Sequence, residues 1–325
     1  MHRMTTPEQL TGCLWGTALG DALGLCREGL SRRRGQRLYP RLEGFQLFGG
    51  RGLASDDTEH ACFTCWALHQ PDAFGPRLRR ALRRWLWALP AGVGLATLRA
   101  GMKASLGFTR SGVFSAGNGP LMRAPVLAVA TGDRLREKLL ISTELTHTDP
   151  RAYQASLMVA AITGYLLGRW NWEAVPGWFQ DQVLGEHLAA IGEHPEIEPV
   201  EYAERRGWGR GISGFVYHTA PMVVLAALRY RDDFRRATTS LVECGGDTDT
   251  TAAIVGGMVG ARVGPAGLPP EWLKAYADWP LTLKAMEELA EGRGSLPSYP
   301  LCLGRNLAFG GAVLAYGLRR LLPPY

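Results

Sequence analysis

Strand-like alternation of apolar and polar residues is almost absent from this 325-residue sequence. Apolar residues instead recur at helical spacing through most of the chain, and a protein built on β-sheets would need the missing alternation. No linker rich in proline, glycine or serine divides the chain. We therefore expect a compact, single-domain, all-α fold over residues 1–325.

Paired cysteine motifs are also scarce. The six cysteines are scattered through apolar segments, and Cys62 and Cys65 form one CxxC pair without the second pair of a typical zinc site. We expect these two residues to be buried thiols. Residues 1–6 are polar and lead directly into a predicted helix, so they do not have the apolar core of a secretory signal. These features favour a reducing, cytoplasmic location.

Lysine is rare, and the formal net charge of +6 comes almost wholly from arginine. Arginine is suited to bidentate contact with phosphate, so an anionic ligand such as a pyrophosphate is compatible with this surface. A solvated surface without a ligand is the alternative. The basic residues form no long tail and no nucleic-acid-binding motif, so nucleic acid is not an expected partner.

Long apolar runs are missing as well. The run over residues 307–318 contains three glycines and is shorter than a membrane span. We expect a core or interface helix there, and no membrane partner.

Residues 27–54 are rich in arginine and glycine without a sustained period, which predicts a long loop. A helix is expected at about 173–191.

What the sequence does have is a stretch from Glu243 to Ala261 that reads ECGGDTDTTAAIVGGMVGA. Gly245 and Gly246 are typical of a tight turn before a helix. Small residues then recur at every fourth position of that helix, and glycines do the same at 12, 16, 20 and 24 in the first predicted helix. Such faces let another helix approach closely. We expect the helix after Gly246 to be central.

Carboxylates and hydroxyls gather at the starts of two predicted helices: Ser55, Asp56 and Asp57 at one, and Asp247, Asp249 and Thr250 at the other. Helix capping is one interpretation, but a single such residue would satisfy it at each helix. Paired carboxylates beside a buried helix raise each other's pKa unless a cation lies between them. If the two starts converge, they would form an all-oxygen site with enough ligands for two Mg²⁺ or Mn²⁺ ions.

Three other features are less specific. Glu28 follows the first predicted helix in a basic loop, where a surface salt bridge is the usual role. The Gly-rich turn at 117–119 has a backbone that could approach a phosphate or ribose closely, and an ordinary turn is the alternative. His147 lies at a predicted helix end, where a cap or a buried polar residue is the alternative to a catalytic group.

Taken together, these motifs resemble the ADP-ribosylglycohydrolase family. The resemblance rests on Gly20-Asp-Ala-Leu-Gly24 with Glu28, Ser55-Asp-Asp-Thr58, Gly117-Asn-Gly119 through Arg123, Thr146-His147, and Gly245-Gly-Asp-Thr-Asp-Thr250. The motifs occur in the family's order over residues 8–275, which leaves 276–325 as a C-terminal helical extension. The resemblance implies an all-α fold with a binuclear Mg²⁺ or Mn²⁺ centre in a cleft.

The resemblance also implies roles for single residues. The implied metal ligands are Ser55, Asp56, Asp57, Asp247, Asp249 and Thr250. The implied catalytic residues are Glu28, Asp56 and Asp57, with Glu28 or Asp57 transferring the proton. The implied substrate-binding residues are Gly117, Asn118, Gly119 and His147. Ser55 stands where the family usually has threonine, and Cys26 stands where proline is common.

The implied activity is metal-dependent hydrolysis of the glycosidic bond between ADP-ribose and an acceptor such as an arginine or serine side chain. The expected partner is an ADP-ribosylated protein or another ADP-ribosyl conjugate, and no particular oligomeric state is predicted. Two alternatives stay open. One is a non-catalytic relative, crystallin-like or ADP-ribose-binding. The other is a hydrolase acting on ADP-ribosylated nucleic acid or on a small ADP-ribosyl metabolite.

Overall fold

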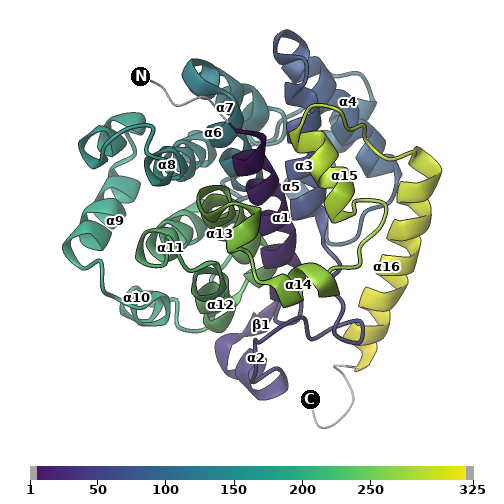
Figure 1. The fold of residues 1–325 in the computed structure, drawn as a ribbon. Helices are drawn as coiled ribbons and strands as arrows, with labels where there is room; N and C mark the ends of the chain where they lie inside the picture. The colour runs from purple at the N-terminus through teal and green to yellow at the C-terminus, as the bar shows by residue number, and fades with distance from the viewer. Residues whose placement is uncertain (1–5, 320–325) are drawn as a thin grey trace.

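Two antiparallel helices, α1 (Pro7–Gly24) and α13 (Thr248–Val263), form the centre of the molecule (Figure 1). The computed structural model describes residues 6–319. The backbones of α1 and α13 are in direct contact: a Cβ atom at Gly16 would clash with the Gly256 carbonyl oxygen, and one at Gly20 with that of Ala252. This contact confirms that the glycine-rich faces permit close packing and that the helix after Gly246 is central.

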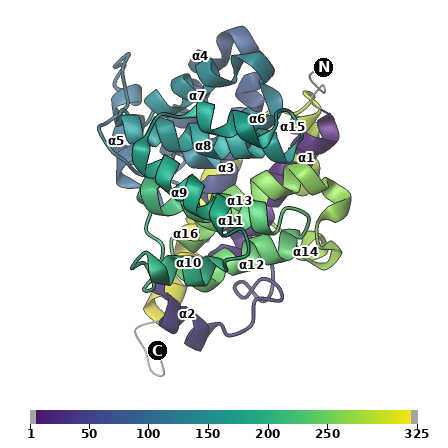
Figure 2. The same cartoon turned by 90° about the vertical axis from the view of Figure 1, so that its left-hand side faces the viewer.

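The remaining helices surround this pair. They are α2 (Arg32–Leu38), α3 (Asp56–Leu68), α4 (Phe74–Trp87), α5 (Leu95–Ser105), α6 (Ala124–Ala130), α7 (Leu135–Glu144), α8 (Pro150–Leu166), α9 (Gln182–Glu193), α10 (Pro199–Arg205), α11 (Val216–Arg229), α12 (Phe234–Cys244), α14 (Pro270–Ala275), α15 (Leu283–Ala290) and α16 (Tyr299–Arg319). In Figure 1, α9–α12 lie on one side of α1, and α3, α15 and α16 lie on the other. Figure 2 views the molecule from the side of α9 and α11. The all-α prediction is confirmed.

A two-residue strand pair connects the ends of the central helices. Strand β1 (Leu30–Ser31) pairs antiparallel with β2 (Gly245–Gly246), so the segment after α1 lies against the turn before α13. Gly246 has φ +87°, and a Cβ atom there would clash with the Ile212 carbonyl oxygen. Only glycine fits this position. The strand pair brings the residues just after α1 beside the start of α13.

Two segments differ from the sequence-based expectation. Residues 27–54 include β1 and the short helix α2, which has no apolar period because its one buried residue is Gly35. A Cβ atom at Gly35 would lie 2.8 Å from Cδ of the buried Arg27 side chain, so α2 packs on an arginine and not on an apolar core. Helix α9 begins at Gln182, because a 3₁₀ segment containing Pro176 occupies 172–178.

A core or interface helix was expected at 307–318; the helix is longer than that range, and the core alternative was wrong about burial. Helix α16 has 21 residues and runs along the edge of the molecule (Figure 1). Its outer side chains are exposed, including Leu307 at 59% and Leu314 at 70%, whereas Phe309 on the inner face is 4% exposed. Among the described residues, α16 alone has the length and hydropathy of a possible membrane span.

The cysteines agree with their interpretation as thiols. None of the six forms a disulfide within the part of the chain that the structure describes, and five of them are buried. Burial raises the pKa of Cys65 to about 12 and that of Cys62 well above its usual value. Both groups are therefore protonated near neutral pH.

Candidate active site

The start of α3 is held by Asp21, a residue of α1. The Asp21 carboxylate accepts hydrogen bonds from Ser55 N at 2.8 Å, Thr58 N at 3.1 Å and Thr58 Oγ1 at 2.6 Å. Ser55 Oγ accepts a further bond from Asp57 N at 3.4 Å. The amides of Asp57 and Thr58 in the first turn of α3 are thus satisfied without the carboxylates of Asp56 and Asp57. Capping does not account for these two side chains.

Asp57 connects the two helix starts. Its Oδ2 accepts from Ser55 Oγ at 3.3 Å and from Thr250 Oγ1 at 3.1 Å. Its Oδ1 is buried and has no hydrogen-bond partner among the described residues. Leaving a buried polar atom unpaired costs about 1–3 kcal/mol, and more when the group is charged. A cation at this oxygen would remove that cost.

The start of α13 is capped from another segment. Thr248 N donates to Glu28 Oε2 at 2.9 Å, although the two residues are 220 positions apart in the sequence. Asp247 is the N-cap residue by backbone position, but its side chain makes no capping hydrogen bond. Its Oδ2 instead accepts from Asn118 Nδ2 at 2.6 Å. The Asp247 carboxylate is therefore available to a ligand on the cleft side.

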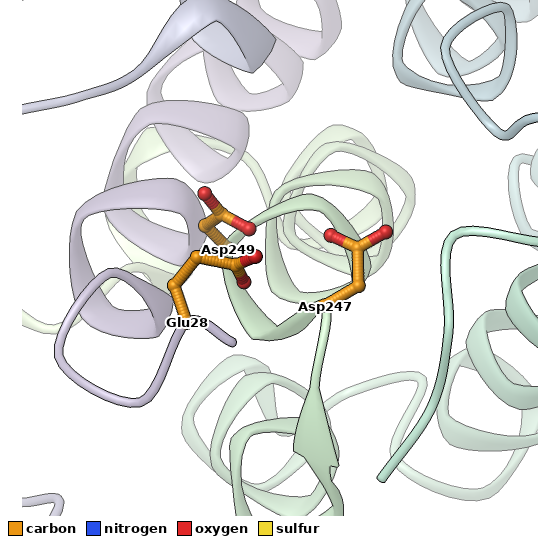
Figure 3. Close-up of side chains that lie close together, drawn as sticks. All are labelled: Glu28, Asp247 and Asp249. Atoms are coloured by element: carbon orange, nitrogen blue, oxygen red, sulfur yellow. The ribbon is translucent and has the colours of Figure 1, made fainter. Parts of the chain in front are cut away.

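Three carboxylates converge at this helix start (Figure 3). Glu28, Asp247 and Asp249 each place one oxygen so that all three atoms lie within 4.8 Å of one another. Burial and the nearby Glu28 carboxylate raise the pKa of Asp249 well above its usual value. Carboxylates this close cannot all be ionised unless a cation lies among them. Their all-oxygen chemistry, together with the unpaired Asp57 Oδ1, fits a hard divalent cation such as Mg²⁺ or Mn²⁺.

The carboxyls of the α3 start are shifted in the same direction. Burial and the carboxylates of Asp21 and Glu59 raise the pKa of Asp56 well above its usual value. Burial and Asp56 do the same for Asp57. For Asp21, burial raises the pKa to about 6, against the opposing effect of the hydrogen bonds from Ser55 and Thr58. Bound divalent cations would favour the ionised forms of these groups.

The acidic cluster forms one end of a cleft of about 720 Å³. The predicted site residues that line this cleft are Glu28, Asp56, Gly117, Asn118, Gly119, His147, Asp247, Asp249 and Thr250. Ser55 and Asp57 lie outside this lining, at 4% and 1% exposure. Asp57 contacts it by accepting from Thr250 Oγ1, and Ser55 Oγ donates in turn to Asp57. The structure thus brings all the predicted residues to one region, and their individual roles remain predictions.

Asn118 reaches from the Gly-rich turn to the acidic cluster. Its amide Nδ2 donates to Asp247 Oδ2 and, at 3.0 Å, to Thr219 Oγ1. Its backbone N–H donates to the Gly214 carbonyl at 2.9 Å, which joins the turn to a second loop of the cleft. Asn118 therefore fixes the orientation of Asp247, in addition to any contact it makes with substrate.

His147 lies behind the Gly-rich turn and is 2% exposed. Its Nδ1 lies 2.9 Å from Thr146 Oγ1. A Cβ atom at Gly119 would lie 3.0 Å from the imidazole Cε1, so the glycine leaves room for the ring. Burial and the guanidinium of Arg123 lower the pKa of His147 to about 3. The imidazole is neutral near pH 7 and acts there as a hydrogen-bonding group rather than as a cation.

Sequence reasoning missed two residues of this region. Asp21 is the single charged residue within an otherwise apolar and small-residue stretch of α1, and that isolation was the available signal. Arg210 lines the cleft and is its one arginine among the described residues. It belongs to the segment 192–211, which carries no recognisable motif.

Comparisons with known proteins agree with the geometry. A family model for ADP-ribosylglycohydrolase matches residues 3–298. An uncharacterized protein of Archaeoglobus fulgidus is 30% identical over 300 residues, covering 87% of this chain and 95% of that protein. The ADP-ribosyl-[dinitrogen reductase] glycohydrolase of Rhodospirillum rubrum is 26% identical over 300 residues, covering 83% and 92%.

A solved structure described as an ADP-ribosylglycohydrolase-related protein complex has the same fold. It is similar to this chain with a TM-score of 0.63 and 26% identity, and the match covers 92% of this chain and 98% of that one. The family match spans the Gly-rich face of α1, the acidic starts of α3 and α13, and the Gly-rich turn. The chain therefore belongs to the ADP-ribosylglycohydrolase family.

Proposed function

We propose that this protein hydrolyses the glycosidic bond between ADP-ribose and an acceptor group, with two Mg²⁺ or Mn²⁺ ions held between the starts of α3 and α13. The observation that carries the proposal is the convergence of Glu28, Asp247 and Asp249 at one end of a cleft of about 720 Å³. Membership of a glycohydrolase family supports a hydrolase that acts on ADP-ribose linkages.

The proposed ion ligands are Ser55, Asp56, Asp57, Asp247, Asp249 and Thr250. When bound, divalent ions supply positive charge that orients the ribose hydroxyls and a water molecule and stabilises charge developing at the anomeric carbon. The hydrogen bond from Asn118 holds the Asp247 carboxylate in place for this role. The bond from Thr250 Oγ1 to Asp57 fixes the two helix starts relative to each other.

Glu28 is our choice as the proton-transfer residue. It lines the cleft, whereas Asp57 is 1% exposed and hydrogen-bonded to two hydroxyls behind the lining. Thr248 N–H fixes Oε2 of the Glu28 carboxylate, which orients the group toward the cleft. A carboxyl placed there can donate a proton to the departing acceptor or accept one from water.

Other residues of the cleft lining suit the ADP portion. Arg210 is placed to contact a pyrophosphate, and a guanidinium can do so through two parallel hydrogen bonds. His147 offers a neutral imidazole beside the turn at 117–119. Because the Rhodospirillum rubrum relative is named for a modified protein, we propose a protein side chain, such as arginine or serine, as the acceptor.

The test is release of ADP-ribose from arginine-linked and serine-linked conjugates in Mg²⁺, in Mn²⁺ and in EDTA. We expect release that depends on the metal and that is lost in Asp249→Asn. Asp72→Asn is the matched control, because its side chain is 98% exposed and far from the cleft lining. Undiminished release in EDTA would contradict the metal requirement. Binding of ADP-ribose without release from any conjugate would favour the non-catalytic alternative.

A further inference from the structure

A second cavity, of about 280 Å³, adjoins the cleft at the acidic cluster. Glu28, Asp56, Gly92 and Asp249 line both spaces. The carboxylates therefore form a partition between a large cleft and a smaller cavity. A substrate with its ribose at these carboxylates would place its two halves in the two spaces.

The wall of the second cavity facing the carboxylates is largely apolar and aromatic. It is formed by Phe48, Phe309, Val313 and Tyr316, with Leu25 and Leu47 beside them. The ring of Phe48 lies 5.8 Å from that of Phe309 and, edge to face, 5.5 Å from that of Tyr316. Aromatic faces of this kind accept flat groups, either neutral aromatic rings or a delocalised cation such as guanidinium.

Phe48 is held in an unusual backbone conformation at this wall. Its φ is +52°, in the left-handed region that residues other than glycine rarely adopt. Its N–H donates to the hydroxyl of Tyr316 at 3.0 Å, so α16 holds the strained residue in place. Backbone strain of this type concentrates at ligand sites.

Helix α16 is fixed firmly enough to act as a wall. Arg305 forms a buried ion pair with Asp278 at 2.7 Å, and Asn306 Nδ2 donates to the Ala88 carbonyl at 2.9 Å. The family match ends at residue 298, immediately before α16 begins at Tyr299. Phe309, Val313 and Tyr316 of the wall thus come from a segment outside the part of the chain that matches the family model.

We propose that this second cavity is the acceptor subsite, and that α16 makes it selective for a flat group of side-chain size. The inference rests on the proposed hydrolysis. The bond from the anomeric carbon to the acceptor heteroatom breaks at the carboxylate partition, the water oxygen bonds to that carbon, and the acceptor heteroatom gains a proton. ADP-ribose remains in the cleft, and the free acceptor remains in the second cavity.

The size of the cavity sets the class of acceptor. A volume of 280 Å³ equals that of roughly nine water molecules, each occupying about 30 Å³ in the liquid. It admits one extended side chain or a small molecule, but not the surface of a folded protein. A planar guanidinium or aromatic acceptor fills this space against the rings better than a serine does.

The test compares Val313→Trp, which fills the subsite, with Leu314→Trp on the outer face of the same helix, where Leu314 is 70% exposed. Substrates are ADP-ribosylarginine, 4-nitrophenyl ADP-ribose and an ADP-ribosylserine peptide. In the wild type we expect kcat/KM to be at least about tenfold higher for the two flat acceptors than for serine. Val313→Trp should lower their kcat/KM by about tenfold or more.

Two controls distinguish a filled subsite from loss of ADP-ribose binding and from a general effect of tryptophan on α16. The affinity for ADP-ribose, measured by calorimetry, should change by less than about twofold in Val313→Trp, because the cleft is untouched. Leu314→Trp should behave as wild type. Gly317→Leu provides a second filling variant, since a Cβ atom at Gly317 meets nothing within 4 Å and the residue lines the cavity.

Unchanged kcat/KM for all substrates in both folded filling variants would overturn the subsite, as would a wild-type preference for serine. These outcomes leave the proposed hydrolysis intact, because the wild type still turns over. A wild type that releases ADP-ribose from none of the three substrates would instead contradict the proposed function and the subsite together.

Discussion

The two acidic helix starts have similar sequences, but the structure holds them in different ways. At α3, Asp21 and Ser55 accept from the amides of Asp57 and Thr58, Asp56 lines the cleft, and Asp57 is buried behind the cleft lining. At α13, a carboxylate from another segment caps the helix, and Asp247 and Asp249 face the cleft. Both helix starts thus present carboxylates to the cleft, but only the α3 start also places one, Asp57, at an inner position.

The difference indicates that the α3 start mainly supports the fold and the ion site, whereas the α13 start mainly contacts substrate. The α3 start is joined to the core through α1, so changes there should affect folding and ion binding first. The α13 start lies between the cleft and the second cavity, so changes there should affect turnover first.

The largest effect is expected for Asp249→Asn. Removing one charge from the cluster of three carboxylates should lower kcat by about 10²–10³-fold, the usual cost of losing a major electrostatic group. It should also raise the melting temperature in EDTA, because the variant removes carboxylate repulsion. Rates from steady-state kinetics and melting by circular dichroism check the two parts. A variant with lower activity and a lower melting temperature in EDTA would show that Asp249 stabilises the metal-free fold, contrary to this prediction.

Asp21→Ala should mainly destabilise the fold. The change leaves the buried donors Ser55 N, Thr58 N and Thr58 Oγ1 without their acceptor, at a cost of about 3 kcal/mol or more in the free energy of unfolding. Urea denaturation measures this loss. Asp72→Ala, on the surface, should change the free energy by less than about 0.5 kcal/mol. Equal stability of the two variants would show that Asp21 does not hold α3.

A substantial part of this account could be predicted from the sequence. The glycine repeats identified the faces on which α1 and α13 meet, because a helix face without side chains favours close packing against another backbone. The two acidic clusters predicted where carboxylates gather in the fold, because capping needs fewer carboxylates than they contain. Local spacing and residue type carry both of these signals.

The rest depended on tertiary contacts that no local pattern encodes. The role of Asp21 exists only because α1 passes beside the start of α3. Helix α2 forms without an apolar period, since it packs on the stem of Arg27. The apolar residues at 307–318 predicted a core or interface helix, but one face covers Phe48 while the other is exposed. The second cavity followed from that placement.

The stability of the metal-free protein should fall as pH rises. Asp21 has a folded-state pKa of about 6 against 3.8 for its usual value, and the pKa values of Asp56 and Asp57 are raised well above theirs. The folded state therefore binds more protons than the unfolded state above about pH 4, and the protonated forms stabilise it. That stability is lost as pH rises through the folded values.

Melting in EDTA should therefore shift down by a few degrees between pH 4.5 and pH 7. At pH 7, Mn²⁺ should reverse the shift, because the ions favour the charged carboxylates. Thermal scans with and without Mn²⁺ at both pH values are the measurement. A melting temperature that rises with pH in EDTA would contradict the raised pKa values.

Asn118→Ala should have the smallest effect. Loss of the hydrogen bond to Asp247 Oδ2 frees that carboxylate to rotate, and we expect kcat/KM to fall by about tenfold. The melting temperature should change little, because the backbone hydrogen bond from Asn118 N to the Gly214 carbonyl is kept. Steady-state kinetics with a matched Thr219→Val variant, which removes only the second partner of Nδ2, distinguishes the two bonds. Equal effects of both changes would assign Asn118 a purely local structural role.

The most direct test of the central claim is a calorimetric titration of the metal-free protein with Mn²⁺. If the starts of α3 and α13 form one binuclear centre, the wild type binds two ions, and both Asp57→Asn and Asp249→Asn bind fewer or bind more weakly. Binding that is unchanged in either variant, or no binding at all in the wild type, would contradict a shared metal centre.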